Sequence, residues 1–300
     1  EGRVAGAYVA GSGIGMETIT EAAGPTPQGP PEFVGRVVVS EEDIIRESET
    51  TTQSQRWMRH EMRSTGLPNE YLNDPDQVNH SYTYGNAVAV IDFLLKGNIE
   101  DARKILDFYK ALYGGYLAES EPFVGFRNCY NSIDASDAAL ARLTEQRIHS
   151  GPNAWLGLAI LDYTERTGDT RYLSVLNGII NLLIATQSRE GAIRLSPVKE
   201  YRVYDQTTEK WQTVQNPEFS VFPTEPNSAV YALFTKASLY YQQTNPDVAV
   251  RCKEAASKIQ GWLIKQNYNS QTGQFNRAQG DATFATDANI LPIIDFDPTR

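Results

Sequence analysis

Glu225 is the carboxylate of this sequence whose surroundings best suit acid–base chemistry. It stands at the start of an apolar helical stretch, soon after the apolar residues Phe219, Val221 and Phe222. Burial among apolar groups disfavours the charged form and raises the pKa of a carboxyl group, whereas the positive end of a helix dipole lowers it. A carboxylic acid that stays protonated near neutral pH can donate a proton in catalysis. The alternative is that Glu225 only helps to fix the start of the helix.

A second group of acids, Asp134 and Asp137, lies in the polar segment 131–137. Beside an acid such as Glu225, a second carboxylate can activate water or attack a substrate directly. It can also hold the hydroxyl groups of a ligand. The alternative is that both aspartates cap a short helix over residues 138–142. We therefore take Glu225, Asp137 and Asp134 as the catalytic candidates.

An Asn or Asp residue recurs at one point of a repeated pattern in the chain. Each is followed by an apolar stretch, a turn of a few residues and a second helical stretch. Asn and Asp are preferred N-cap residues, so we predict that each one caps a helix. The four residues are Asn86, Asn153, Asn227 and Asp287. We also predict that they face the end of the helices where a ligand binds.

The two helices of each repeat differ in character. The first is apolar nearly all round, as in a helix buried on both sides, and the second is amphipathic. The first helices are predicted at 82–96, 152–166 and 227–241, and the second at 99–113, 170–187 and 247–267. Stacked hairpins of this kind give an inner and an outer layer of helices. The fold class is therefore all-α, an α/α toroid. Its three hairpins, leading helix and unfinished last pair fit either a small ring or one part of a longer protein.

Long connections join one hairpin to the next, at 114–149, 188–224 and 268–283. All of them lead into inner helices, so we expect them to gather at one end of the ring. The turns within hairpins are only a few residues long. Long loops on one face of a rigid scaffold are common places for function.

Residues 1–39 differ from the rest because glycine and proline dominate them. They exclude a long helix, and the stretches Arg3–Ala10 and 33–39 are candidate strands. At Ser40 a hydroxyl cap followed by acidic residues predicts a helix start. We therefore divide the chain into an extended arm or linker, 1–39, and a toroid domain, 40–300. Such an arm could assemble the protein by adding a strand to a neighbouring subunit.

Composition narrows the classes of partner. The chain has 300 residues and a net charge of −10, and it lacks a basic patch, so nucleic acid is not expected as a partner. The longest apolar stretch is far shorter than the ~20 residues of a membrane span. Three histidines without ligand spacing predict neither metal nor cofactor. Cys129 and Cys252 could pair or could both be buried thiols. Residue 1 is Glu; a removed secretory signal would explain this, and we expect an extracytoplasmic location.

Several strings resemble the six-hairpin glycosidase-like proteins. They are SYTYGNAVAVI from Ser81, GPNAWLGLAIL from Gly151, TEPN from Thr224 and the turn TGDTRYL from Thr167. The resemblance covers about residues 50–295 at the level of architecture. It implies an (α/α)6 toroid of the kind found in glucoamylase-type and cellulase-type hydrolases. This chain departs from that pattern in having three complete hairpins where a full ring has six.

The resemblance implies a carbohydrate-active protein, a glycoside hydrolase that acts on a polysaccharide or oligosaccharide through paired carboxylates. Aromatic rings stack on the C–H faces of sugars, so Tyr82, Tyr84 and Trp155 join the four Asx residues as candidate substrate contacts. Core packing is the simpler role for Trp155. Two other functions remain open, a glycan-binding protein without catalysis and an assembly protein that uses residues 1–39.

Overall fold

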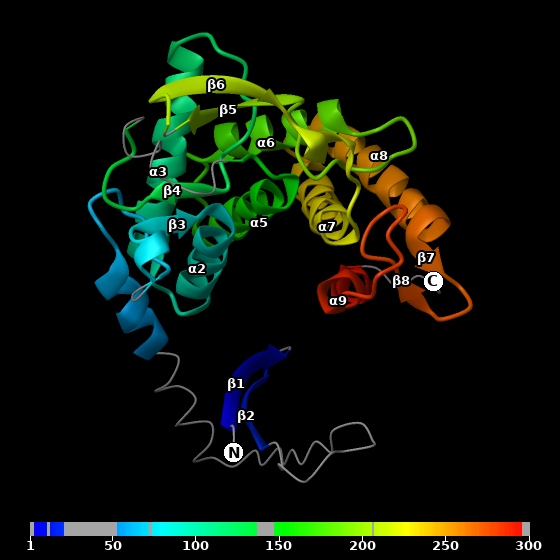
Figure 1. Ribbon diagram of the computed structural model, residues 1–300, viewed down its shortest axis with the longest axis horizontal. Coiled ribbons are helices and arrows are strands. Elements are labelled where there is room, and N and C mark those ends of the chain that lie inside the picture. The colour runs from blue at the N-terminus through cyan, green and yellow to red at the C-terminus, as the bar shows by residue number, and fades with distance from the viewer. Residues whose placement is uncertain are drawn as a thin grey trace. The chain divides into compact units, whose positions relative to one another are not determined.

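The computed structural model describes residues 3–10, 13–20, 53–71, 74–136, 147–205 and 207–295. The chain forms two compact units, Glu1–Met58 and Arg59–Arg300. In the first, β1 (Arg3–Ala10) pairs antiparallel with β2 (Gly13–Thr20) (Figure 1). The strand expected at β1 is confirmed, whereas β2 was not expected. The strand expected at 33–39 lies outside the described residues.

The second unit is built from helical hairpins, as the sequence predicts. After a helix that ends at Glu61, the pairs are α2 (Thr83–Leu95) with α3 (Ile99–Ala118), α5 (Ser150–Thr167) with α6 (Leu173–Thr186), and α7 (Thr224–Tyr241) with α8 (Pro246–Trp262). A further helix, α9 (Thr286–Asp295), follows them.

The helices form two layers within this unit. The inner helices contact one another in the order α2, α5, α7, α9, and the outer helices in the order α3, α6, α8. Figure 1 shows the inner helices as an arc with the outer helices around it. The predicted all-α toroid fold is therefore confirmed. Large side chains such as Phe93, Leu156 and Phe234 fill the space between layers and are fully buried.

The predicted N-caps are wrong. The N-cap residues of α2, α5 and α7 are Tyr82, His149 and Pro223, and each helix begins three residues before its asparagine. The three asparagines, Asn86, Asn153 and Asn227, occupy the fourth helical position and are 0% exposed. The physical reason is that their side chains pair with other parts of the chain and leave the amides of the first turn to other partners.

Asn153 and Asn227 each hold the loop that leads into their own helix. The Oδ1 atom of Asn153 accepts from the amide of Phe126 at 2.8 Å, and its Nδ2 donates to the carbonyl of the same residue at 2.9 Å. Asn227 pairs with Ile193 in the same two-bond manner, at 2.7 and 2.9 Å. The backbone N–H and C=O groups of a buried segment thereby form their hydrogen bonds with a side chain, where a neighbouring strand would otherwise supply the partners.

The fourth repeat follows the same pattern, but through Asn289. Its side chain pairs with both backbone groups of Phe275, at 2.8 and 3.0 Å. Asp287, which we aligned with the asparagines, lies two residues earlier and accepts from the amide of Ala288 at 2.7 Å. The predicted alignment of Asp287 is therefore wrong, because the repeat is defined by the asparagine whose side chain pairs with the loop backbone. In the first repeat Asn86 instead donates to Tyr109 and accepts from Ser81.

Each of these loops is also tied to the preceding inner helix. In each loop, the residue two positions after the one bound by the asparagine has a backbone carbonyl that accepts a hydrogen bond. The donor is the first backbone amide of the preceding inner helix, and the distance is 2.9 Å each time. The pairs are Asn128 with Thr83, Leu195 with Ser150, and Arg277 with Thr224. We call these three loop stretches, 126–128, 193–195 and 275–277, the bridging segments. They join neighbouring inner helices where those helices begin.

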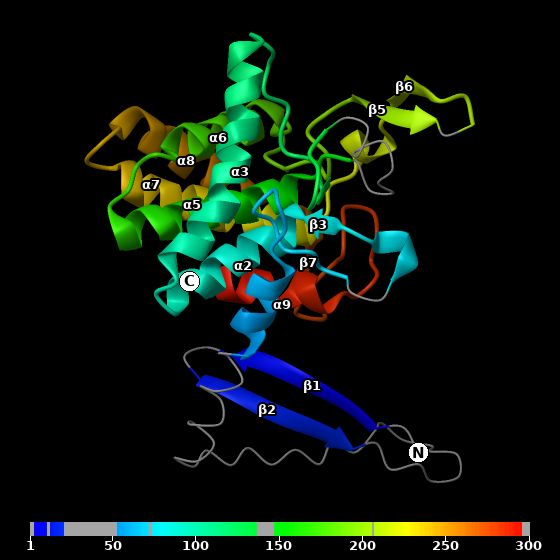
Figure 2. The ribbon, with the colours of Figure 1, turned by 90° about the vertical axis from the view of Figure 1, so that its left-hand side faces the viewer.

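The long connections carry short two-stranded sheets. These are β3 (His80–Tyr82) with β4 (Cys129–Asn131), β5 (Glu200–Asp205) with β6 (Lys210–Gln215), and β7 (Tyr268–Asn269) with β8 (Gln274–Phe275). Short helical turns, η1 (Pro75–Gln77), η2 (Pro217–Ser220) and the π-helical η3 (Leu263–Asn267), accompany them. Figure 2 shows β3, β5, β6 and β7 at one end of the helices, as predicted for the long loops. We call this end the rim.

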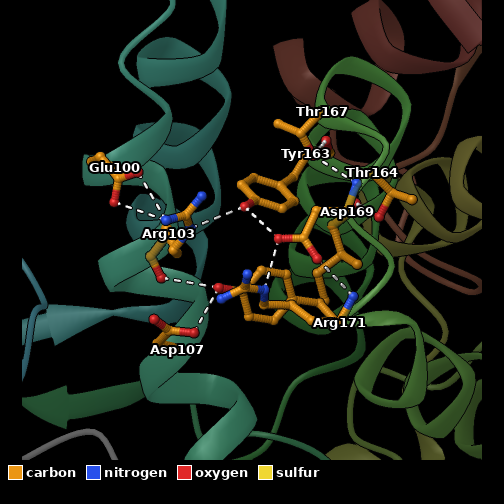
Figure 3. A network of polar contacts seen from close by, with 10 residues as sticks. Glu100, Arg103, Asp107, Tyr163, Thr164, Thr167, Asp169 and Arg171 are labelled. Carbon is orange, nitrogen blue, oxygen red and sulfur yellow. Dashed lines mark hydrogen bonds and ion pairs between the residues drawn. The ribbon is translucent and has the colours of Figure 1, made fainter.

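A polar network lies between α3 and the α5–α6 turn (Figure 3). The hydroxyl of Tyr163 donates to Asp169 at 3.1 Å and accepts from Arg103 at 3.3 Å, and Asp169 pairs with Arg171 at 2.7 Å. The hydroxyl of Tyr172 donates to the carboxylate of Asp107 on α3 at 2.6 Å. Neighbouring hairpins are thus joined here by side chains, and at the rim by the bridging segments. Of the two cysteine alternatives, buried free thiols hold for Cys129 and Cys252.

Candidate functional site

The corrected repeat points to one variable position at the rim. In each inner helix a Thr or Ser opens the first turn and the asparagine stands three residues later. Between them the second helical position changes from helix to helix. It is Tyr84 in α2, Gly151 in α5, Glu225 in α7 and Asp287 in α9. Because the bridging segments hold neighbouring helix starts together, we examine these four positions as one cluster.

Glu225 lies in an apolar part of this cluster. It lines a cavity of about 370 Å³ together with Asp287, and with apolar residues such as Leu195, Val221 and Pro223. The pKa of Glu225 is raised to about 7, by burial first and by the charge of Asp287 second, while an interaction with Trp155 opposes both. The apolar surroundings predicted for Glu225 are therefore present. A carboxyl group in this state is a mixture of acid and carboxylate near neutral pH.

Trp155 and Tyr84 lie beside Glu225. Their rings meet edge to face with centroids 5.5 Å apart. Tyr84 is 48% exposed, and its pKa is raised by burial and by the charge of Glu225. The Nε1–H of Trp155 is buried and makes no hydrogen bond of regular geometry with the described residues. Its weaker interaction with Glu225 is the one that lowers the pKa of that carboxyl group. Trp155 therefore contacts the cluster and is more than a core residue.

Gly151 leaves room next to the carboxylate. A Cβ atom at this position would lie 3.5 Å from Oε2 of Glu225 and 3.6 Å from the ring of Pro226. Any longer side chain would therefore extend into the space beside Glu225. The second position of α5 is thus the one place in the cluster without a side chain.

The other predicted site residues lie elsewhere or have structural partners. The hydroxyl of Tyr82 donates to Gln77 at 2.9 Å. Asp134 is exposed in the loop after β4, and its hydrogen bonds with Ser136 lower its pKa. Asp137 lies outside the described residues. Asn86, Asn153 and Asn227 are fully buried with both ends of the amide paired, so we assign them to the scaffold and not to ligand contacts.

A second carboxyl group with a similar shift was not anticipated. Burial raises the pKa of Glu70 to about 7, opposed by a hydrogen bond at 2.8 Å from the amide of Tyr82. The carboxyl group fills the space beside Gly85, where a Cβ atom would overlap it. Glu70 is a lone acid in a loop, so nothing local in the sequence distinguishes it. The only signal is the glycine at a helical position that is Pro or Ala in the other repeats.

Neither a metal centre nor a membrane-spanning helix is found in the described ranges. No group of three His, Cys, Asp or Glu side chains there could hold a metal ion. No described helix is long and apolar enough to cross a membrane.

Comparisons with known proteins bear on the fold. No protein-family model and no curated protein matches the chain. A solved glycosidase in complex with glucose is 10% identical with a TM-score of 0.58, over 81% of this chain and 63% of that one. A possible member of the GH105 family from Salmonella enterica serovar Paratyphi A is 12% identical (TM-score 0.53, 81% and 58%). Another, from Klebsiella pneumoniae, is 14% identical (0.54, 81% and 57%).

These likenesses show that the chain shares the α/α toroid of glycosidases. The chain spans 63% of the first glycosidase's length. At such low identity they do not assign an activity to it.

Proposed function

We propose that the protein is glycoside hydrolase-like and acts on a polysaccharide or oligosaccharide, with Glu225 as the proton donor. The observation that carries this proposal is the burial of Glu225 at the rim, in a cavity that it shares with a second carboxylate. The glycosidase structures that share the fold support the same class of ligand.

In this proposal the proton of Glu225 goes to the oxygen of the glycosidic bond as that bond breaks. The second carboxylate either activates water or attacks the sugar carbon, so that the bond to the leaving group is replaced by a bond to oxygen. Asp287 is the preferred second carboxylate because it lines the same cavity and its charge acts on Glu225. Asp134 and Asp137 remain the further candidates for this role.

Tyr84 and Trp155 are proposed to hold the sugar. The exposed ring of Tyr84 offers a flat apolar face, which suits the C–H face of a pyranose. The buried Nε1–H of Trp155 offers a donor beside the reacting carboxyl group.

Assembly through residues 1–39 is the second candidate function. Within the described residues, β1 and β2 pair only with each other, so the outer edge of each strand is without a partner strand. Such edges can accept a strand from another subunit. The first proposal, action on a polysaccharide or oligosaccharide, includes an extracytoplasmic location for the protein, where extended glycans are found.

The test of the first proposal is Glu225→Gln. The substitution keeps the shape of the side chain and removes the proton, so turnover should fall by ~10²–10⁴-fold. Turnover would be measured on a panel of plant, algal and bacterial glycans, with thermal unfolding alongside. Glu119→Gln, in an exposed position after α3, is the matched control and should leave turnover unchanged.

Equal turnover of wild type and Glu225→Gln would rule out a catalytic role for this carboxyl group. Binding of a glycan without turnover by either protein would favour a glycan-binding protein. A large loss of stability without a specific loss of rate would assign Glu225 to the helix start.

A further inference from the structure

Two arginines approach one indole ring on the β5–β6 hairpin. The guanidinium carbon of Arg202, on β5, lies 5.2 Å from the ring centroid of Trp211, on β6. Arg127, from the bridging segment before α5, lies 5.9 Å from the same centroid. On the hairpin, Tyr204 meets Trp211 edge to face at 5.4 Å. The hairpin therefore presents an aromatic surface with two cationic groups beside it.

These two positive charges are not neutralised within the described part of the chain. No ion pair there involves Arg127 or Arg202, although the chain as a whole carries a net charge of −10. Three carboxylates of this region have other partners, among them Glu200, which accepts from the side chain of Gln215. Asp205 accepts from the turn amides of the hairpin at 2.9 and 3.2 Å, and Glu218 pairs with Arg147 and His149. Two guanidinium groups without an ion-pair partner, at 5.2 and 5.9 Å from the centroid of one indole ring, attract an anion.

The surface lies at the same end of the molecule as Glu225. The carbonyl of Arg127 accepts a hydrogen bond from the hydroxyl of Thr83 at 2.6 Å. Thr83 directly precedes Tyr84 of the candidate site. Figure 2 shows β5 and β6 projecting from the rim beyond the ends of the helices. A glycan chain bound at Tyr84 and Glu225 would therefore extend toward the β5–β6 hairpin.

We propose that Arg127, Arg202 and Trp211 form an accessory binding surface for an acidic glycan, one that bears carboxylate or sulfate groups. A guanidinium group donates two parallel hydrogen bonds to a carboxylate or sulfate, and the indole packs against the apolar face of a sugar. The choice of a glycan as the ligand rests on the proposed function. The recognition of its charge rests on the arginines alone and requires no catalysis.

The test is binding by isothermal titration, in the full chain and again in its Glu225→Gln variant. The ligands are polygalacturonate for carboxylate, dextran sulfate for sulfate and uncharged dextran. Removing both arginines, by Arg127→Gln with Arg202→Gln, should weaken binding of at least one polyanion by roughly tenfold or more. Either substitution alone should give part of this loss. The matched control is Arg166→Gln, an exposed arginine in the last turn of α5, which should leave binding unchanged.

Which polyanion responds identifies the acidic group, and either response supports the proposal. Equal binding of both polyanions by wild type and the double variant would overturn it. So would an equal loss in the Arg166→Gln control, or equally tight binding of dextran or of duplex DNA. The arginine-dependent binding should persist in Glu225→Gln. If it does while no glycan is turned over by the wild type, the proposed catalysis fails and the accessory surface stands.

Discussion

Burial and the charge of Asp287 both raise the pKa of Glu225, and the two contributions can be measured separately. Because its pKa is raised to about 7, the proton donor should be lost as pH rises through 7, and turnover should fall on the alkaline side. Asp287→Asn removes the repelling charge, so the pKa of Glu225 should drop. The measurement is a carbon-13 NMR titration of the Glu225 carboxyl group in both proteins. An unchanged pKa in Asp287→Asn would show that burial alone sets it.

Glu70 has the same elevated pKa without a place in the candidate cavity, so its effect is on stability. The folded chain keeps its proton up to about pH 7, whereas the unfolded chain loses it near 4.5. Stability from this group is therefore full below pH 4.5 and is lost as pH rises to 7. Glu70→Gln keeps the acceptor for Tyr82 and should be more stable than wild type at pH 8, by up to about 3 kcal/mol.

Thermal unfolding of Glu70→Gln at pH 8 and pH 4 tests this expectation. The gain should be present at pH 8 and absent at pH 4. A gain of the same size at both values would mean that the proton on Glu70 is not its source. The exposed Glu119→Gln is again the control and should show no difference between the two values.

At the scale of elements, the bridging segments depend on single amide side chains. Asn227→Ala would leave the buried amide and carbonyl of Ile193 without partners, which costs about 2–4 kcal/mol for the two groups. We expect a lower free energy of unfolding in urea and a weaker activity, because Glu225 lies two residues away. Gln243→Ala, which removes an amide side chain from the exposed turn after α7, is the control. A loss below about 0.5 kcal/mol in Asn227→Ala would show that water replaces the asparagine readily.

The network of Figure 3 gives the same hairpins a second connection. Tyr163 and Tyr172 reach from the second hairpin to Arg103 and Asp107 of α3. Here ionic and phenolic groups meet near short turns, whereas at the rim the contacts are made by backbone and buried amides. The rim can thus vary its exposed residues without loosening the stack.

For the molecule as a whole, the order of hairpins could be predicted because it depends on local periodicity. Apolar first helices and amphipathic second helices are visible in the sequence, and the structure confirms them. The role of Asn153 and Asn227 could not be predicted, since their partners lie 27 and 34 residues away. The β5–β6 hairpin was missed although its strands, EYRVYD and KWQTVQ, alternate polar residues with Tyr, Val or Trp, which is a strand signal. Glu70 was missed because burial, which sets its pKa, comes from distant residues.

At the scale of the whole molecule, we expect fast hydrogen exchange in the N-terminal residues 1–39. The β1–β2 hairpin there is two-stranded, and such a hairpin is marginally stable in water by itself. Amides of residues 1–39 should therefore exchange with solvent much faster than those of α5 and α7. Hydrogen exchange followed by mass spectrometry measures both in the intact protein. Protection of 1–39 equal to that of α5 would refute the interpretation of this segment as an arm.

The second helical position of the inner helices varies in residue type, while the opening Thr or Ser and the asparagine recur in each repeat. In α5 and α7 a buried asparagine and a bridging segment hold the start of the helix, so the residue at the second position is not needed for that framework. A ring of this kind can change its chemistry by one residue at a time, as Tyr84, Glu225 and Asp287 already illustrate. Gly151 is the one second position without a side chain, and it packs against Glu225 and Pro226. Whatever side chain arrives there would face Glu225 directly, which makes this glycine the shortest mutational path to a new reaction or a new ligand.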